Sequence, residues 1–278
     1  MKSYEIGIYE KAMPNSLSFR EKLLCAKEFG FDFVEISIDE TDEKLNRLYS
    51  SKEDRLALVK DMYDTGIYIR TMCLSGHRKY PLGSSDSKTR EKSLEIMKKA
   101  IEFADDLGIR IIQLAGYDVY YEESTELSKK LFEENLRKCV DMASKKGIIL
   151  AFETMETDFM NTIEKSMNYV KKINSPYLQV YPDCGNITNA CTMYGKNVLE
   201  DFELGRGHIA AVHLKETVPG KFREIPFGTG HVDFKSIINK SLELGVRKFV
   251  AEFWYCGEEN WKDTIKSVRS FMDKHFEC

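Results

Sequence analysis

Four residues whose side chains can bind a metal each follow a short apolar run in the second half of the chain. They are Glu153 after ILAF, Asp183 after QVYP, His213 after IAAV and Glu252 after KFVA. Successive members are 30, 30 and 39 residues apart. Three carboxylates held close together repel one another unless protons or a cation compensate them. Three carboxylates with one imidazole suit Mn²⁺ or Mg²⁺ and also accommodate Zn²⁺ or Co²⁺, so this set predicts one divalent metal ion.

Short apolar runs alternate with longer amphipathic stretches along the whole chain. The runs that we expect to form strands are Tyr4–Tyr9, Phe33–Ile38, Ile67–Leu74, Ile111–Leu114, Ile148–Phe152, Leu178–Tyr181, Ile209–Leu214 and Phe249–Phe253. The stretches that we expect to form helices are Leu17–Phe29, Glu53–Tyr63, Thr89–Leu107, Leu127–Ser144, Ile163–Ile173, Val198–Glu203, Phe234–Leu244 and Trp261–His275. Eight strand–helix units in 278 residues predict an α/β fold, a (β/α)₈ TIM barrel.

The barrel is expected to be a single catalytic domain over residues 1–278, because no linker-like segment interrupts the alternation. An open, doubly wound sheet is the alternative. It is disfavoured because no G-x-G-x-x-G motif follows the first strand. In a TIM barrel the active site lies at the C-terminal ends of the strands. A lone Glu or His at such an end is commonly structural, but four in consecutive units indicate a shared site at the barrel mouth.

The composition excludes several classes of protein. The chain carries 41 Lys and Arg against 45 Asp and Glu, and 42% of its residues are hydrophobic. This hydrophobic content excludes disorder as the main state, and the acidic balance disfavours nucleic acid as a partner. No apolar run reaches the ~18–20 residues of a membrane helix, and residues 1–16 lack the features of a signal peptide. The sequence therefore predicts a cytoplasmic protein with no membrane partner.

Several motifs resemble those of a known family. ILAFETM, VYPDCGN, AVHLKET and VAEFW resemble the xylose-isomerase-like TIM barrels, and within them the sugar and sugar-phosphate 3-epimerases. In the first half, GIYEKA, GFDFVEISIDETDEKLNRL, MCLSGHRKYPLGS and IQLAGYDVYY resemble the branch that acts on ketopentose 5-phosphates. The resemblance implies an isomerase that converts L-xylulose 5-phosphate to L-ribulose 5-phosphate. It also implies a place in carbohydrate metabolism, in L-ascorbate catabolism leading to pentose phosphates.

The resemblance also implies roles for the four residues. Glu153, Asp183, His213 and Glu252 would hold the metal, and Glu153 and Glu252 would form the acid–base pair. In a 2-ketose the C2 carbonyl acidifies the C3 hydrogen. A metal bound to the carbonyl and C3 oxygens would stabilise the enediolate, while one Glu removes a proton and the other returns one on the opposite face. These two residues lie at the two ends of the ligand arc.

Further residues near strand ends could bind the substrate. Lys11, His77, Arg78 and Lys215 could contact a 5-phosphate, and Glu156 could bind sugar hydroxyls or orient a ligand. Asn186 is the sixth residue expected to bind the substrate. A solvated surface position would explain each of them as well. Asn186 and Pro219 stand where the free-sugar epimerases tend to have His and Arg, which favours a phosphorylated substrate.

Other functions remain open from the sequence. A metal-dependent aldose–ketose isomerase, a hydroxypyruvate isomerase, a keto-inositol dehydratase or a free-sugar 3-epimerase could use the same four ligands. A repair endonuclease would need more than the five histidines present and a basic face. A barrel that binds a sugar phosphate without turnover is the non-enzymatic alternative. The expected partner is a small sugar phosphate, and an exposed helix face could form a homodimer.

Overall fold

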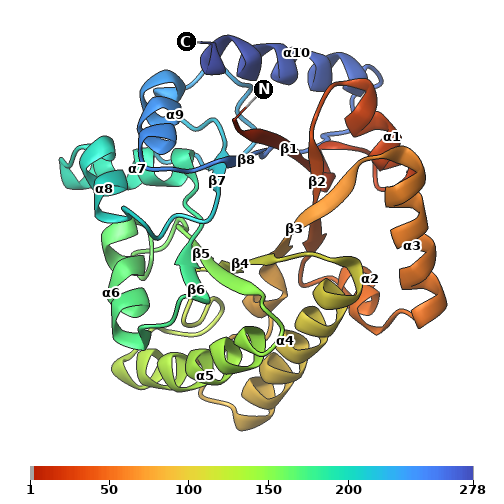
Figure 1. The fold of residues 1–278 in the computed structure, drawn as a ribbon. Coiled ribbons are helices and arrows are strands. Elements are labelled where there is room, and N and C mark those ends of the chain that lie inside the picture. The colour runs from red at the N-terminus through yellow and green to blue at the C-terminus, as the bar shows by residue number, and fades with distance from the viewer. Residues whose placement is uncertain (1–2, 278) are drawn as a thin grey trace.

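Eight parallel strands form one sheet in the order β6-β5-β4-β3-β2-β1-β8-β7. The structure, a computed structural model, describes residues 3–277. The strands are β1 (Glu5–Tyr9), β2 (Phe33–Ile38), β3 (Tyr68–Leu74), β4 (Ile111–Ala115), β5 (Ile149–Glu153), β6 (Leu178–Val180), β7 (Val212–Leu214) and β8 (Lys248–Ala251). Parallel bridges from Val180 to Ile209 and from Asp183 to His213 join β6 to β7. The sheet therefore curls into a ring, as Figure 1 shows, which excludes the open alternative.

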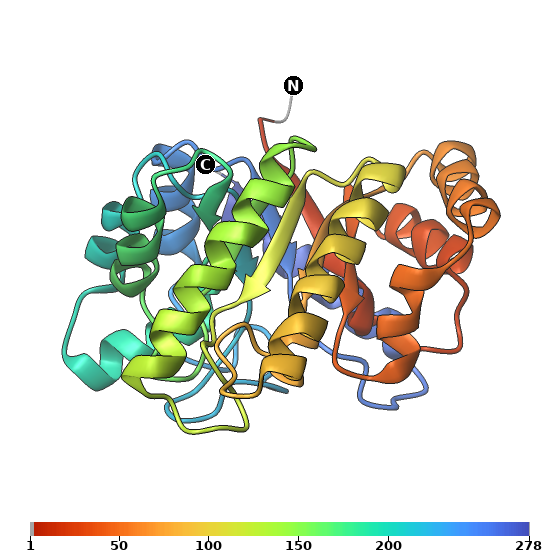
Figure 2. The same ribbon diagram turned by 90° about the horizontal axis from the view of Figure 1, so that it is seen from below.

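Helices surround the ring of strands (Figure 1). The α-helices are α1 (Phe19–Glu28), α2 (Asp42–Asn46), α3 (Lys52–Thr65), α4 (Ser87–Leu107), α5 (Glu126–Ser144), α6 (Ile163–Ile173), α7 (Cys184–Tyr194), α8 (Val198–Leu204), α9 (Phe234–Glu243) and α10 (Trp261–Phe276). Short 3₁₀ helices are η1 (Glu10–Ala12), η2 (Arg47–Tyr49) and η3 (Ser75–Arg78). Figure 2 shows the long helices α4 and α5, in yellow to light green, side by side along the outside of the barrel. None of the helices within residues 3–277 is long and apolar enough to cross a membrane.

The predicted TIM barrel is confirmed. All eight expected strands are present with ends within three residues of the expected ones, and all eight expected helices with ends within two. The largest difference is in β7, which begins at Val212 rather than Ile209. Ile209 pairs with Val180 only as an isolated bridge, so the strand is not continuous there.

The sequence did not predict α7, which begins directly after Asp183. Its sequence, CGNITNACTMY, is rich in residues of low helix propensity. The first eight residues of the helix are nevertheless buried, and a Cβ added at Gly185 would lie only 2.6 Å from the Thr217 side chain. Tertiary packing therefore stabilises a helix that propensity alone does not favour.

Side chains alternate between two cores along each strand. In β2, Val34, Ile36 and Ile38 belong to the large core between the strands and the helices. Phe33 belongs to a smaller cluster inside the barrel. Because successive side chains in a strand point to opposite faces, Glu35 also points into the barrel. The interior therefore contains a buried carboxylate in the middle of a strand.

A second buried carboxylate, Glu10, joins the loops after β1 and β2. Glu10 Oε1 lies 2.8 Å from Lys44 Nζ and 2.7 Å from Arg47 Nη1, and Lys22 is buried nearby. Burial works to raise the pKa of Glu10, but Arg47, Lys22 and Lys44 outweigh it and lower the pKa below its usual value. Glu10 is therefore the anion that compensates a group of cations at the barrel mouth.

Replacing Glu10 with Gln should lower the free energy of unfolding by about 3 kcal/mol at neutral pH, because breaking a buried ion pair leaves its partners uncompensated. Because folding lowers this pKa, the stabilisation is complete above the unfolded-state pKa of about 4.3 and is lost as pH falls through the folded-state value. Urea denaturation of both proteins from pH 8 to pH 3 measures the difference. The exposed Glu91→Gln serves as the control, and a difference that persists unchanged at pH 3 would contradict the ionic role.

Candidate active site

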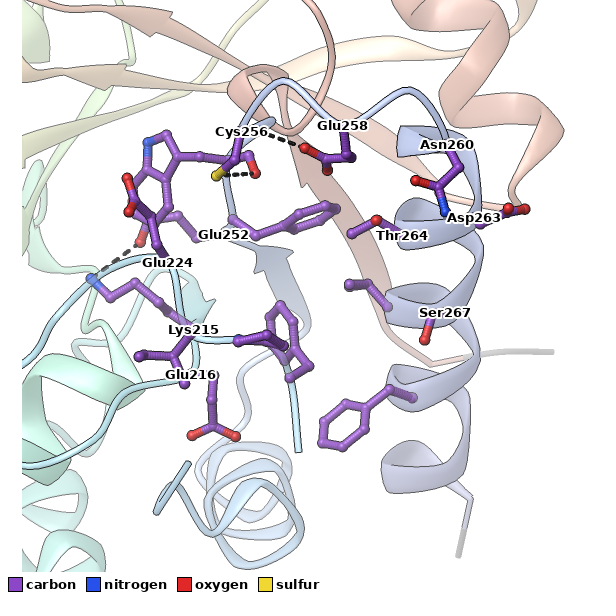
Figure 3. A pocket seen from close by; sticks show the side chains of 17 residues that line it. Lys215, Glu216, Glu224, Glu252, Cys256, Glu258, Asn260, Asp263, Thr264 and Ser267 are labelled. Atoms are coloured by element: carbon purple, nitrogen blue, oxygen red, sulfur yellow. Dashed lines mark hydrogen bonds and ion pairs between the residues drawn. The ribbon is translucent and has the colours of Figure 1, made fainter. Parts of the chain in front are cut away.

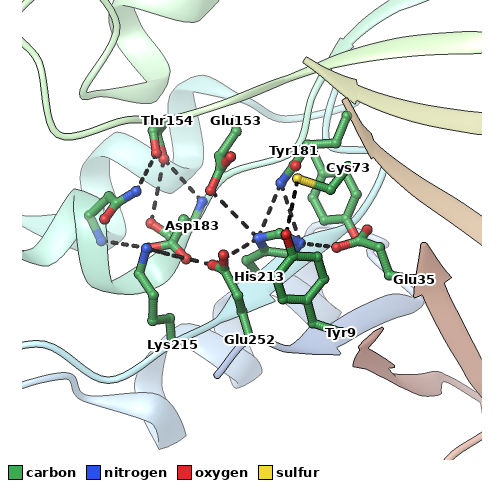
Figure 4. A network of polar contacts seen from close by, with 12 residues as sticks. Tyr9, Glu35, Cys73, Glu153, Thr154, Tyr181, Asp183, His213, Lys215 and Glu252 are labelled. Atoms are coloured by element: carbon green, nitrogen blue, oxygen red, sulfur yellow. Dashed lines mark hydrogen bonds and ion pairs between the residues drawn. The ribbon is translucent and has the colours of Figure 1, made fainter. Parts of the chain in front are cut away.

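The structure brings the four predicted ligands together at the barrel mouth (Figure 4). Glu153 is the last residue of β5, Asp183 immediately precedes α7, His213 lies in β7 and Glu252 follows β8. All four side chains are buried, and one potential ligand atom from each lies within 4.8 Å of the others. The predicted spacing along the chain therefore corresponds to one compact cluster.

Asp183 uses its two carboxylate oxygens differently. Oδ1 accepts a 2.6 Å hydrogen bond from the backbone N–H of Asn186 and so caps the start of α7. Oδ2 is buried and accepts no hydrogen bond among residues 3–277, as is also true of Glu252 Oε2. The groups that approach these two oxygens are cationic: Lys215 Nζ lies 3.3 Å and 3.5 Å from them, and His213 Nδ1 lies 3.1 Å from Glu252 Oε2. Three carboxylates, two of them with such an oxygen, and one imidazole fit a divalent cation.

The His213 ring is fixed between carboxylates. Its Nδ1 lies 3.1 Å from Glu252 Oε2 and 3.6 Å from Glu153 Oε1. Its Nε2 lies 2.6 Å from Glu35 Oε1, on the other side of the ring. The Tyr181 ring meets the imidazole edge-on with the ring centroids 4.8 Å apart. Nδ1 is therefore the nitrogen that faces the cluster.

Two cationic groups compensate the carboxylates. Lys215 Nζ lies 3.3 Å from Asp183 Oδ2 and 3.5 Å from Glu252 Oε2, and the lysine is buried. Burial disfavours the charged form, but the carboxylates of Asp183 and Glu252 outweigh it and raise the pKa of Lys215. Similarly, Glu35 and Glu252 outweigh burial and raise the pKa of His213 well above its usual value.

The pKa values of the three carboxyl groups in the cluster are shifted in different directions. Burial raises the pKa values of Glu153 and Asp183. Burial also works to raise the pKa of Glu252, but Lys215 and His213 outweigh it and hold this pKa below its usual value. The cluster therefore contains one carboxylate held ionised beside two that resist ionisation, an arrangement that a divalent cation would relieve.

A cavity at the mouth reaches the cluster. Five of the six predicted substrate-binding residues line it beside Glu153 and Glu252: Lys11, Arg78, Glu156, Asn186 and Lys215. A larger neighbouring cavity of about 550 Å³ shares Lys215, Glu252 and Trp254 with it and extends toward α10 (Figure 3). The sequence-predicted positions therefore converge on one accessible space.

His77 is not among the residues that line this cavity. Its ring is buried, and Nε2 donates a 3.1 Å hydrogen bond to the backbone carbonyl of Ser93 in α4. Burial lowers the pKa of His77 to about 4, so the ring is neutral at physiological pH. The structure therefore places His77 where it joins η3 to α4.

The other predicted residues have defined contacts. Tyr117 donates a 2.6 Å hydrogen bond to Glu156 Oε2, and the Arg78 guanidinium stacks 4.7 Å from the Tyr120 ring centroid. Asn186 Nδ2 donates to the Thr154 carbonyl at 2.8 Å, while its Oδ1 is buried with no hydrogen-bond partner within the described part of the chain. Lys215 belongs to the carboxylate cluster rather than to the outer wall.

Sequence reasoning missed three residues of the site. Arg223 lines the mouth cavity and stacks 5.6 Å from the Trp254 ring centroid. Glu35 and Gln113 lie in the middle of strands and contact His213 from below the cluster, with Gln113 Nε2 3.1 Å from Nδ1. A charged or amide side chain on the inward-facing positions of an otherwise apolar strand is the signal that could have revealed the last two.

Comparisons with known proteins identify the family of the chain. A family model described as a xylose isomerase-like TIM barrel matches residues 24–275. L-ribulose-5-phosphate 3-epimerase UlaE from Salmonella heidelberg (strain SL476) is 45% identical over 98% of this chain and 93% of its own length. The protein of the same name from Escherichia coli O139:H28 (strain E24377A / ETEC) is 46% identical over the same shares of the two chains.

Solved structures show the same fold at lower identity. D-allulose 3-epimerase from Methylomonas sp. superposes with a TM-score of 0.81 at 17% identity, over 99% of this chain and 98% of that one. A structure of L-ribulose 3-epimerase gives a TM-score of 0.76 at 18% identity, over 98% and 94%. With relatives that are named as epimerases, the chain is an enzyme of the isomerase class. It belongs to the xylose isomerase-like TIM barrel family.

Proposed function

We propose that this enzyme is a metal-dependent 3-epimerase that interconverts L-xylulose 5-phosphate and L-ribulose 5-phosphate by two-base proton transfer. The observation that carries the proposal is the pair of buried glutamates, Glu153 and Glu252, which approach the same nitrogen of His213. The substrate is proposed from the relatives at 45% and 46% identity, which are named L-ribulose-5-phosphate 3-epimerase.

Glu153, Asp183, His213 and Glu252 would hold one divalent cation. Their three carboxylates and one imidazole favour Mn²⁺ or Mg²⁺, with Zn²⁺ or Co²⁺ also accommodated. Bound there, the cation would supply Lewis-acid stabilisation of the negative charge that develops on the substrate oxygens. The buried ammonium of Lys215 adds a fixed positive charge beside the same carboxylates.

Proton transfer would fall to the two glutamates. Glu153 ends β5 and Glu252 follows β8, and in Figure 4 one lies above and the other below the Nδ1 atom of His213 that both approach. A ketose bound between them would lose its C3 proton to a carboxylate oxygen of one residue and receive a proton at C3 from the other. The roles exchange when the reaction runs in reverse. In this proposal the pair supplies a base on each face of the substrate, as inversion of configuration requires.

Arginines at the mouth would bind the 5-phosphate. The guanidinium of Arg78 is oriented by the rings of Tyr117 and Tyr120, and its Nε is buried with no hydrogen-bond partner within residues 3–277. Arg223 lies across the same cavity on Trp254. Guanidinium groups bind phosphate through paired, charge-assisted hydrogen bonds. Lys11, although paired with Asp39 at 2.5 Å, lines the cavity as a further cation.

Replacing Arg78 with Met should raise KM for the phosphorylated ketose by about 10–100-fold, because a hydrogen bond to a charged group contributes about 1.5–3 kcal/mol. KM for the unphosphorylated ketose should change little. Steady-state kinetics with both ketoses measure the effect. Arg110→Met is the matched control, because Arg110 immediately precedes β4 and so lies at the end of the strands away from the mouth. An equal loss with both ketoses would contradict a phosphate contact.

Incubation with L-xylulose 5-phosphate in D₂O tests the whole proposal. The Mn²⁺-loaded enzyme should form L-ribulose 5-phosphate with solvent deuterium at C3, as proton NMR of the isolated sugars would show. An aldose product with label at C1 would instead identify an aldose–ketose isomerase. Turnover of free ketoses without turnover of the phosphate would overturn the phosphorylated substrate and leave a free-sugar 3-epimerase.

A further inference from the structure

A fully buried carboxylate lies behind His213, on the side away from the cluster. Glu35 Oε1 is 2.6 Å from Nε2 of His213. Glu35 Oε2 accepts hydrogen bonds from Thr71 Oγ1 at 2.7 Å and from the Tyr181 hydroxyl at 2.9 Å. All four side chains have no exposed surface. Figure 4 shows Glu35 and Tyr181 on the far side of the imidazole from Asp183 and Lys215.

We propose that Glu35 is the positioning residue that selects Nδ1 of His213 as the metal-binding nitrogen. Thr71 and Tyr181 both donate to Oε2 of Glu35, so Oε1 is the oxygen that is left for His213. Nε2 of His213 therefore carries the hydrogen that Oε1 accepts. Nδ1, on the opposite side of the ring, faces Glu153 and Glu252, so a metal held by these residues would take the place of the proton on Nδ1. The inference rests on the metal site proposed above.

The Glu35 carboxylate is itself held in place by hydrogen bonds from residues on or next to two other strands. Thr71 lies on β3 and Tyr181 follows β6, so the two donors to Glu35 come from opposite parts of the barrel wall. The Tyr181 ring also packs edge-on against the imidazole. Rotation of the His213 ring would break the contact with Glu35. Partners of this kind fix the orientation of a metal-binding histidine and increase its basicity.

Metal affinity provides a test that does not depend on the substrate. Glu35→Gln keeps the size of the side chain but removes its charge, and it should raise the dissociation constant for Mn²⁺ by about 10–100-fold in competition with a chelator. Ile36→Val is the matched control, because Ile36 is equally buried on the same strand but faces the helices. Unchanged affinity in Glu35→Gln, or an equal loss in Ile36→Val, would overturn the proposal.

The tautomer provides a signature that loss of packing would not produce. In Mg²⁺-loaded protein labelled with ¹⁵N-histidine, His213 should show a protonated Nε2 and an unprotonated Nδ1 in two-bond ¹H–¹⁵N spectra. The chain has five histidines, so comparison with His213→Asn assigns the signal. A protonated Nδ1 in the loaded wild type would overturn the proposal. If Glu35→Gln does not fold, Thr71→Val tests the same network, with a several-fold weaker affinity expected and unchanged affinity contradicting it.

These measurements separate two kinds of failure. A wild-type enzyme that binds Mn²⁺ but does not act on L-xylulose 5-phosphate would disprove the proposed substrate and leave the role of Glu35 testable. A Glu35→Gln variant that retains wild-type affinity and tautomer but loses turnover would disprove positioning through His213 and leave the epimerase assignment intact.

Discussion

Replacing Glu153 with Gln should lower kcat for epimerisation by about 10²–10⁴-fold, the range that a positioned acid or base contributes. Glu153 is 4% exposed, and its Oε1 lies 3.6 Å from Nδ1 of His213, so the change removes a proton-accepting oxygen from the centre of the cluster. The amide keeps the shape of the side chain and one oxygen. Turnover should therefore fall far more than substrate affinity, which steady-state kinetics with metal analysis of each preparation would show.

Isotope exchange sharpens the same experiment. With Glu252 intact, Glu153→Gln should still exchange deuterium into C3 of one epimer without inverting it, because one base remains on one face. Glu156→Gln is the matched control: Glu156 lines the same cavity but lies outside the four-residue cluster, so its change should raise KM more than it lowers kcat. Wild-type turnover in a fully metal-loaded Glu153→Gln enzyme would show that this residue is not an essential base.

The strand-end position of the ligands explains why the sequence predicted them. Asp183 and His213 follow apolar runs whose ends lie at one edge of a parallel barrel, so their spacing is visible without coordinates. Glu35 lies in the middle of FVEISI, where every residue is buried. Glu35 alternates with the apolar Val34 and Ile36, but in a strand buried on both faces the sequence does not show which face is the barrel interior.

In the loops, the direction in which each side chain points could not be predicted from the sequence. His77 and Arg78 are adjacent in η3, yet one contacts Ser93 in α4 and the other lines the mouth cavity. Nothing in their residue types distinguishes these two environments. The position of Asn186 could not be predicted for a different reason. Its backbone N–H donates to Asp183 Oδ1 in the first turn of α7, a helix that its composition did not predict.

Lys215 acts as a built-in counterion of the four-residue cluster. Its ammonium lies 3.3 Å from Asp183 Oδ2 and 3.5 Å from Glu252 Oε2, and its side chain is 6% exposed. The carboxylates raise the pKa of Lys215 against burial, so the group stays protonated across the neutral range. A divalent cation held by the same carboxylates would provide the same compensation with twice the charge.

Replacing Lys215 with Met should therefore destabilise the metal-free protein much more than the loaded one. Without metal, the loss of a buried partner should lower the free energy of unfolding by about 3–5 kcal/mol. With saturating Mn²⁺ the loss in free energy of unfolding should be smaller, because the metal compensates the carboxylates in place of Lys215. The variant also removes the repulsion between the Lys215 ammonium and the metal. Urea denaturation in EDTA and in Mn²⁺ measures both values, and chelator competition should show tighter Mn²⁺ binding.

The comparison with Lys11 decides between a counterion and a simple packing role. Lys11 forms an ion pair with Asp39 in the same mouth cavity, but its side chain is 25% exposed. Lys11→Met should change stability by no more than about 1 kcal/mol, as for other solvent-accessible pairs, and equally with and without Mn²⁺. If Lys215→Met also lost the same free energy in EDTA and in Mn²⁺, its charge would not substitute for the metal. Because the ammonium and the metal compensate the same oxygens, the two effects must be coupled if both contact the cluster.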